Sequence, residues 1–185
     1  MMTITNNIAI LEKETIEDTK KLFDHDQLSK VFSILRQCDI IDIYGILDNL
    51  FLAKHFQSQM NYIHKKVNIC DLIGSEKTMA HLADNSHCAI IISYSGQTQN
   101  LLDVAQIYHD KQIPIIALTC IGENSLNHLS NASLYLSSKE MLNIKIGDFA
   151  SSTSLKYLFD ILYAGIFSFH YKENLEQKII LASLA

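Results

Sequence analysis

Short apolar runs alternate with segments of helical spacing along most of this chain. The runs are rich in Ile, Val and other residues that suit β-strands, and polar stretches separate them. The pattern predicts five strands, at Ile40–Tyr44, Lys66–Cys70, Cys88–Ser93, Pro114–Thr119 and Ser133–Leu136. Strands that alternate with helices at this interval are joined by right-handed crossovers, which predicts a parallel sheet with helices on both faces.

Helical periodicity is clearest in two of the intervening segments, Asn49–Tyr62 and Gln99–Lys111. The strand residues Cys88–Ile92 and Ile115–Leu118 are apolar at successive positions rather than at alternate ones. Continuous apolar runs of this length are typical of central strands that are covered on both faces. These two strands are therefore expected in the middle of the sheet.

The two ends of the chain also have helical patterns. Residues 12–38 have the spacing of two short helices with a break at Asp24–Asp26. A long helix is predicted from about Ser151 to His170, and it is apolar on nearly every side, which favours either a homodimer interface or burial in the core. We expect a helical segment at residues 1–39, packing on the domain or on a dimer partner, and one folded domain at residues 40–185.

Composition narrows the class of protein. The 185 residues are 48% hydrophobic with only one Pro and six Gly, which fits one domain with a full core and no disordered linker. The net charge is −5 and the basic residues are scattered, so direct contact with DNA is not expected. No apolar run is long enough to cross a bilayer and the N-terminus lacks the order of a signal peptide, which predicts a cytoplasmic protein without a membrane partner.

Cysteine and histidine usage gives no sign of a disulfide framework or a metal. The four cysteines are Cys38, Cys70, Cys88 and Cys120. They form no Cys-x-x-Cys pair and each lies in or beside an apolar segment, so reduced, semi-buried thiols are expected. The eight histidines include no i, i+4 pair, and neither a metal site nor a cofactor is predicted.

The polar residues 93–98, Ser-Tyr-Ser-Gly-Gln-Thr, connect the third predicted strand to the next helix. Gly96 permits a tight turn, and the first amides of the helix have no internal partner. Together with the helix dipole and the hydroxyls of Ser93, Ser95 and Thr98, they would form a cradle for a phosphate monoester. The alternative is that Ser95 or Thr98 is only an N-cap and Gly96 only a turn. The position at the carboxyl end of a central strand favours phosphate binding.

The pattern Ser-x-Ser-Gly-x-Thr at residues 93–98 closely resembles the phosphate loop of sugar-isomerase (SIS) domains. The resemblance runs from the Ile40 strand to the end of the long helix. It implies an α/β fold, a flavodoxin-like three-layer αβα sandwich with a five-stranded parallel sheet.

Within this family the chain resembles the RpiR-type transcriptional regulators. Their sugar-binding half follows a pair of connecting helices similar to residues 11–42, and its last helix opens with a Ser-Ser pair, as at Ser151-Ser152, and carries an Asp-Ile-Leu step, as at residues 160–162. Their helix-turn-helix has no counterpart in this sequence. The resemblance implies a homodimeric phosphosugar sensor that would reach DNA only through a helix-turn-helix domain outside this chain.

The chain departs from the family at two places. The first strand–helix turn of SIS domains reads Gly-x-Gly-x-Ser, whereas residues 45–49 are Gly-Ile-Leu-Asp-Asn. Asp48 would oppose a nearby phosphate, and it either caps the helix from Asn49 or accepts hydrogen bonds from sugar hydroxyls. In the isomerase domain of glucosamine-6-phosphate synthase the catalytic Glu lies three residues before a Tyr-Ile-His step. The similar step at residues 62–64 is preceded by Gln59, which cannot take a proton.

These residues predict a ligand site without a catalytic base. The expected ligand-binding residues are Ser93, Ser95, Gly96, Gln97, Thr98, Gly45, Asp48, Asn49, Ser138 and Gln59. Other possible bases, which are expected to be solvated surface residues, are Glu76, His81, Glu123 and Glu140. We expect a non-catalytic sensor of a sugar phosphate. The alternatives are a stand-alone aldose–ketose isomerase of phosphosugars and an interaction module that has lost its ligand.

Overall fold

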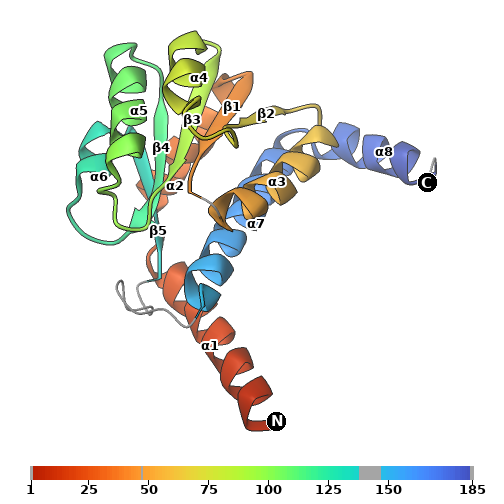
Figure 1. The fold of residues 1–185 in the computed structure, drawn as a ribbon. Helices are drawn as coiled ribbons and strands as arrows, with labels where there is room; N and C mark the ends of the chain where they lie inside the picture. The colour runs from red at the N-terminus through yellow and green to blue at the C-terminus, as the bar shows by residue number, and fades with distance from the viewer. Residues whose placement is uncertain (1, 47, 138–146, 184–185) are drawn as a thin grey trace.

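A parallel sheet between two layers of helices forms the body of the protein (Figure 1). The computed structural model describes residues 2–46, 48–137 and 147–183. The strands are β1 (Ile40–Tyr44), β2 (Lys66–Ile69), β3 (His87–Ile92), β4 (Ile115–Cys120) and β5 (Ala132–Leu136). They are ordered β2-β1-β3-β4-β5, and every neighbouring pair is parallel. The predicted three-layer αβα sandwich with five parallel strands is confirmed.

Each predicted strand is present and differs from its prediction by at most one residue at either end. β3 lies at the centre of the sheet, and all its residues after His87 are buried. β4 pairs with both β3 and β5, so it is also an internal strand. The continuous apolar runs therefore identified strands that are covered on both faces, because neither face of such a strand meets water.

Each face of the sheet is covered by its own set of helices. One face packs against α2 (His25–Gln37), α3 (Asp48–Asn61) and α7 (Phe149–Phe169). The other packs against α4 (Glu76–Leu82), α5 (Gln99–Asp110) and α6 (Ser125–Leu129). Strand side chains alternate between these two cores: Ile43 and Ile90 belong to the first, and Tyr44 and Ile91 to the second.

The N-terminal helix differs from its prediction. α1 (Met2–Lys21) begins ten residues before the predicted start at Glu12. Residues 2–7 are exposed, so no apolar stripe marks this part of the helix in the sequence. α1 packs beside α7 and its first turns extend past the carboxyl edge of the sheet (Figure 1). Over the described length of this helix, the buried residues are two threonines, Thr15 and Thr19.

The long apolar helix α7 is covered largely by its own chain. Leu155, Leu158, Phe159 and Leu162 are buried in the core, and α1, α2, α3 and β5 all contact this helix. α8 (Tyr171–Ala182), which was not predicted, follows it, and none of its described residues is buried. Within the described residues no helix has the length and apolar character needed to cross a membrane.

A buried carboxylate in the middle of β1 is fully hydrogen-bonded. Asp42 is 1% exposed, and its Oδ2 lies 2.6 Å from both the Nδ1 of His87 and the hydroxyl of Tyr108. Its Oδ1 accepts from the side-chain amide of Asn68 at 2.8 Å. Burial raises the pKa of Tyr108 far above its usual range, so this phenol remains a hydrogen-bond donor to Asp42. These partners explain how a charged residue is accommodated in a central strand.

The fold brings two of the separated cysteines together. Cys38, at the end of α2, and Cys88, in β3, have their sulfur atoms 3.2 Å apart in the core. All four cysteines are free thiols. The hydrogen bond with Cys88 and the ammonium of Lys65 lower the pKa of Cys38. In the described part of the chain, no three His, Cys, Asp or Glu side chains gather where they could hold a metal ion.

Candidate functional site

The loop between β3 and α5, residues 93–98, forms a tight turn that only glycine allows at its centre. Gly96 has a φ of +64°, and a Cβ added there would lie 2.1 Å from the Oδ1 of Asn124. That oxygen caps α6 by accepting from the amide of Asn127 at 3.0 Å. The Gly96 carbonyl in turn accepts from the amide of Leu126 at 3.1 Å. The turn is therefore fixed by the start of α6 on one side.

Several backbone amides in this loop and in the first turn of α5 lack a protein acceptor. Among the described residues, no acceptor lies within hydrogen-bonding distance of the amides of Ser95, Thr98, Gln99 and Asn100. The first amides of a helix have no partner within the helix, and the helix dipole gives this end a partial positive charge. The loop therefore presents several donors to an anion without burying a cationic side chain.

The hydroxyls of the loop are close to these amides and do not cap the helix. Thr98 is the N-cap residue of α5, but its side chain makes no capping hydrogen bond. Its Oγ1 instead lies 3.2 Å from the Oγ of Ser93, which is buried. Ser95 is exposed, and its Oγ accepts from the amide of Gln97 at 3.2 Å. The Gln97 side chain accepts from the hydroxyl of Ser125 at 2.8 Å, which ties the loop to α6.

The turn after β1 lies beside this loop. A Cβ added at Gly45 would be 3.5 Å from the Cβ of Ile92, the residue that precedes the loop. α3 begins at Asp48, one residue earlier than predicted, so the Asp48 carboxylate lies in the first turn of the helix. A negative charge is favourable at that end of a helix.

A cavity of about 220 Å³ opens between the ends of β1, β3 and β5 and the start of α7. Its lining residues are Ile46, Asp48, Asn49, Tyr94, Leu136, Asp148 and Ser151. The cavity brings two predicted residues, Asp48 and Asn49, together with Tyr94 of the phosphate-loop sequence. It also contains Asp148 and Ser151, whose place in the site was not predicted, although the Ser-Ser pair at the start of the last helix was the available signal. Its carboxylates suit hydroxyl donors better than anions.

A chain of hydrogen bonds joins the loop after β3 to α1. The hydroxyl of Tyr94 donates to the carbonyl of Ser137 at 3.1 Å, and the amide of Ser137 donates to the Oγ of Ser154 at 3.0 Å. Ser154 Oγ lies 2.7 Å from the Oγ1 of Thr19. Ser137, Ser154 and Thr19 are all buried, so water does not compete for these hydrogen bonds.

Two of the expected ligand residues are not found in this group. Gln59 lies near the C-terminal end of α3, away from the strand-end loops, and lines neither this cavity nor the one described next. Its Oε1 is buried, with no hydrogen-bond partner among the described residues. Ser138 lies outside the described residues, as does Glu140. His81 and Glu123 are exposed, whereas Glu76 is half-buried and lines the second cavity.

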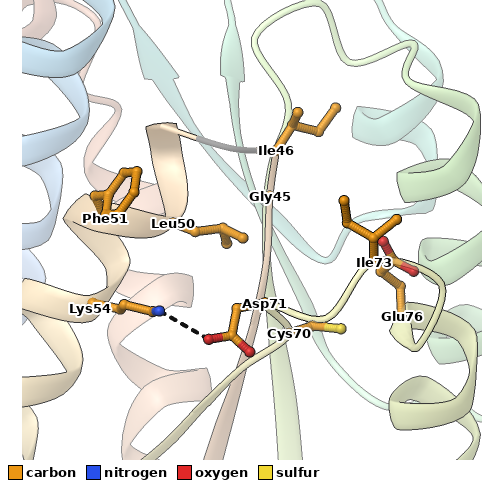
Figure 2. Close-up of a pocket in the computed structure, with 9 residues that line it drawn as sticks. All are labelled: Gly45, Ile46, Leu50, Phe51, Lys54, Cys70, Asp71, Ile73 and Glu76. Atoms are coloured by element: carbon orange, nitrogen blue, oxygen red, sulfur yellow. Dashed lines mark ion pairs between the residues drawn. The ribbon is translucent and has the colours of Figure 1, made fainter.

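A second cavity, of about 500 Å³, lies between α3 and the segment that follows β2. The residues that line it are Gly45, Ile46, Leu50, Phe51, Lys54, Cys70, Asp71, Ile73 and Glu76 (Figure 2). Lys54 and Asp71 form an ion pair across it, with Nζ and Oδ2 2.9 Å apart. No local sequence pattern indicated this cavity, because its apolar residues come from three separate elements.

Comparisons with known proteins agree with this architecture. The model of the SIS domain family matches residues 34–158. An uncharacterised HTH-type transcriptional regulator of Bacillus subtilis, YbbH, is 24% identical over 159 residues, which are 86% of this chain and 56% of the relative. A second uncharacterised HTH-type regulator, from Caldanaerobacter subterraneus, is 24% identical over 163 residues, 88% of this chain and 57% of its own. The chain spans little more than half the length of these relatives.

Solved structures with the same fold include ligand complexes. Vibrio vulnificus NanR complexed with ManNAc-6P has a TM-score of 0.88 at 22% identity, covering 98% of this chain and 68% of that protein. The sugar isomerase domain of an RpiR transcription factor from Sphaerobacter thermophilus has a TM-score of 0.83 at 11% identity, covering 97% and 98%. An Escherichia coli CFT073 protein in complex with a sugar phosphate has a TM-score of 0.76 at 16% identity, covering 92% and 91%. At these identities the likeness establishes the shared fold.

Proposed function

The chain belongs to the SIS domain family, and on that premise we propose that it is the phosphosugar-sensing domain of an RpiR-type transcriptional regulator. The observation that carries this proposal is the group of unpaired amides around Gly96. A phosphate monoester can accept hydrogen bonds from several donors at once, which a turn at a helix N-terminus supplies. The regulator relatives and the sugar-phosphate complexes of NanR and of the Escherichia coli protein support the same assignment.

In the proposed complex the phosphate and the sugar occupy different parts of the site. The phosphate takes the amides of residues 95–100 and the hydroxyls of Ser95 and Thr98. The sugar lies over Gly45, where the missing side chain permits close approach, and its hydroxyls donate to Asp48 in the neighbouring cavity. This arrangement favours the second of the two roles considered for Asp48. It keeps that carboxylate on sugar hydroxyls rather than on the phosphate.

A sensor needs only binding, whereas an isomerase also needs a base. The position that aligns with a catalytic Glu holds Gln59, whose amide cannot accept a proton from carbon. In a sensor, the ligand shifts an equilibrium between two states by its difference in affinity for them. We propose that a DNA-reading domain, outside this sequence, reports that shift.

The second candidate function is a phosphosugar aldose–ketose isomerase, which the carboxylates of Asp48 and Asp148 in one cavity favour. Either could act as the base if it lay within reach of the sugar C1–C2 bond. An assay of aldose–ketose conversion with hexose and pentose phosphates distinguishes the two functions. Turnover that is lost on Asp48→Asn but retained by Gln59→Ala would replace the sensor by the enzyme.

The sensor is further proposed to act as a homodimer, with α8 in the interface. The described residues of α8 include no buried one, and Leu175, Ile179 and Ile180 are exposed along it. Exposed apolar side chains on one helix are typical of a surface that a second copy covers. Sedimentation analysis should therefore give a dimer, and Ile179→Asp should shift it to the monomer. A monomeric native chain would contradict this proposal.

Thermal unfolding tests ligand binding directly. Sugar phosphates at a hundredfold excess over Kd should stabilise the protein by about 2.7 kcal/mol. For a chain of this size that corresponds to a rise in Tm of roughly 5–10 °C. The matching unphosphorylated sugars serve as controls and should leave Tm unchanged. If no hexose, amino-sugar or pentose phosphate raises Tm, the chain is not a phosphosugar sensor.

A further inference from the structure

The second cavity continues the proposed sugar site across the sheet edge. Ile46 lines both cavities, and Gly45, in the wall of the second, lies beside Ile92 at the end of β3. In Figure 2 Leu50 and Ile73 lie on opposite sides of Gly45, one from α3 and the other from the segment after β2. Because the strand order is β2-β1-β3, a ligand held at the end of β3 and passing over β1 reaches this cavity next.

The wall of this cavity that is free to contact a ligand is mostly carbon. Its apolar side chains are those of Ile46, Leu50, Phe51 and Ile73. The charged groups already have partners, since Lys54 pairs with Asp71 and Glu76 accepts from the amide of Gly74 at 2.8 Å. The hydrogen bond and charge of Lys54 lower the pKa of Asp71, so both groups of the pair are charged at neutral pH.

The mouth of the cavity exposes large apolar side chains to solvent. Phe51 is 71% exposed and Ile73 is 88% exposed, on opposite walls. Ile46, where the two cavities meet, is 47% exposed. Exposed apolar side chains that gather at a ligand-binding edge are typical of a surface that a bound group covers.

Resting on the proposed function, we infer that this cavity receives the N-acyl group of an N-acylated amino-sugar phosphate. The loops after β3 and β2 are two strand spacings apart, roughly 10 Å, which a hexose phosphate with a substituent on carbon 2 can bridge. The acyl methyl leaves water for the carbon wall formed by Leu50, Phe51 and Ile73. The amide is within the same cavity as Lys54 and Asp71, which are half-exposed and able to exchange water for its oxygen and N–H. A free hydroxyl would gain nothing from the carbon wall.

Two matched ligand pairs test this inference by titration calorimetry on the full chain. N-acetylglucosamine 6-phosphate is compared with glucose 6-phosphate, and N-acetylmannosamine 6-phosphate with mannose 6-phosphate. Removal of one methyl-sized group from an apolar pocket weakens binding by about tenfold or more. The N-acetyl member of at least one pair should therefore bind roughly tenfold more tightly than its partner.

Surface variants then locate the preference. Phe51→Ser combined with Ile73→Ser removes carbon from both sides of the mouth, and both side chains are exposed enough that folding is unaffected. This variant should reduce the N-acetyl preference to about twofold, while affinity for glucose 6-phosphate or mannose 6-phosphate stays the same. Leu72→Ser is the matched control, since Leu72 is 70% exposed and adjacent in sequence but does not line the cavity. Its preference should equal that of the native chain.

The outcomes separate this inference from the proposed function. If the plain sugar phosphates bind as tightly as the N-acetyl ones in both pairs, the acyl inference is wrong and the sensor proposal stands. An N-acetyl preference that survives the double substitution would also overturn it. If no member of either pair binds, the sensor proposal fails and the acyl inference fails with it.

Discussion

Two neighbouring parts of the same sheet edge have opposite chemistry. The loop after β3 offers unpaired amides and hydroxyls at the start of α5, whereas the segments after β1 and β2 offer the carbon of Leu50, Phe51 and Ile73. Both follow parallel strands that end at one edge, so the backbone architecture treats them alike. The difference comes from the residues placed there. A fold of this kind fixes where a ligand binds, and the side chains of each loop select which part of it.

The sharpest way to break the polar side of this comparison is Gly96→Ala. The residue has a left-handed φ, and the added Cβ would meet the Asn124 oxygen that caps α6. We expect at least a hundredfold loss of sugar phosphate affinity, because the amides no longer converge, and about 1–3 kcal/mol of lost stability. Calorimetry and chemical denaturation measure the two effects.

Gly74→Ala is the matched control for that substitution. Gly74 also has a positive φ, of +91°, but none of the described atoms lies within 4 Å of an added Cβ. Only the conformational penalty of about 1 kcal/mol should remain, with phosphate affinity unchanged. Equal affinity losses in the two variants would mean that the Gly96 turn has no special role in binding.

Ser95→Ala should have the next largest effect. The Ser95 hydroxyl is exposed beside the unpaired amides, and a hydrogen bond to a charged phosphate contributes about 1.5–3 kcal/mol. Affinity for a sugar phosphate should fall by roughly tenfold while Tm without ligand stays the same. Ser168→Ala, on the exposed side of α7, serves as the control. Unchanged affinity in Ser95→Ala would remove this hydroxyl from the site.

The smallest expected effect concerns Asp48, at the boundary between the polar and apolar parts. Asp48→Asn removes a negative charge near the phosphate and weakens an acceptor for sugar hydroxyls. Binding of inorganic phosphate should strengthen by about threefold, and binding of sugar phosphate should weaken by a similar factor. Competition titrations with the two ligands measure this, with the exposed Asp110→Asn as control. A change in the same direction for both ligands would assign Asp48 a single role, in phosphate repulsion or in helix structure.

The strands and the phosphate loop could be predicted because their signals are local. Continuous apolar runs marked β3 and β4, and a glycine among hydroxyl residues directly after a strand marked residues 93–98. The position of Asn124 against Gly96 was not predictable, since it joins residues from two different strand–helix units. The apolar cavity depends on three elements meeting in space, and no single stretch of sequence carries that pattern.

The ends of the chain illustrate the same limit from the other side. The start of α1 and all of α8 are largely exposed, so the apolar periodicity that identifies a helix was absent there. Cys38 and Cys88 are fifty residues apart and were interpreted as isolated, yet the junction of α2 and β1 places them in contact. Contacts of this range depend on the strand order, which becomes known only once the sheet is assembled.

The attachment of α1 through Thr15 and Thr19 has a mechanical consequence. Among the described residues of this twenty-residue helix, these two alone are fully enclosed, and both are held by hydroxyl hydrogen bonds. If α1 swings away from α7, water can replace those bonds and little carbon surface becomes newly wetted. The barrier to detaching this arm is therefore low compared with that for a helix seated by leucines. Because the same bonds continue through Ser154 to the tyrosine of the β3 loop, tension at one end of the molecule is transmitted to the other.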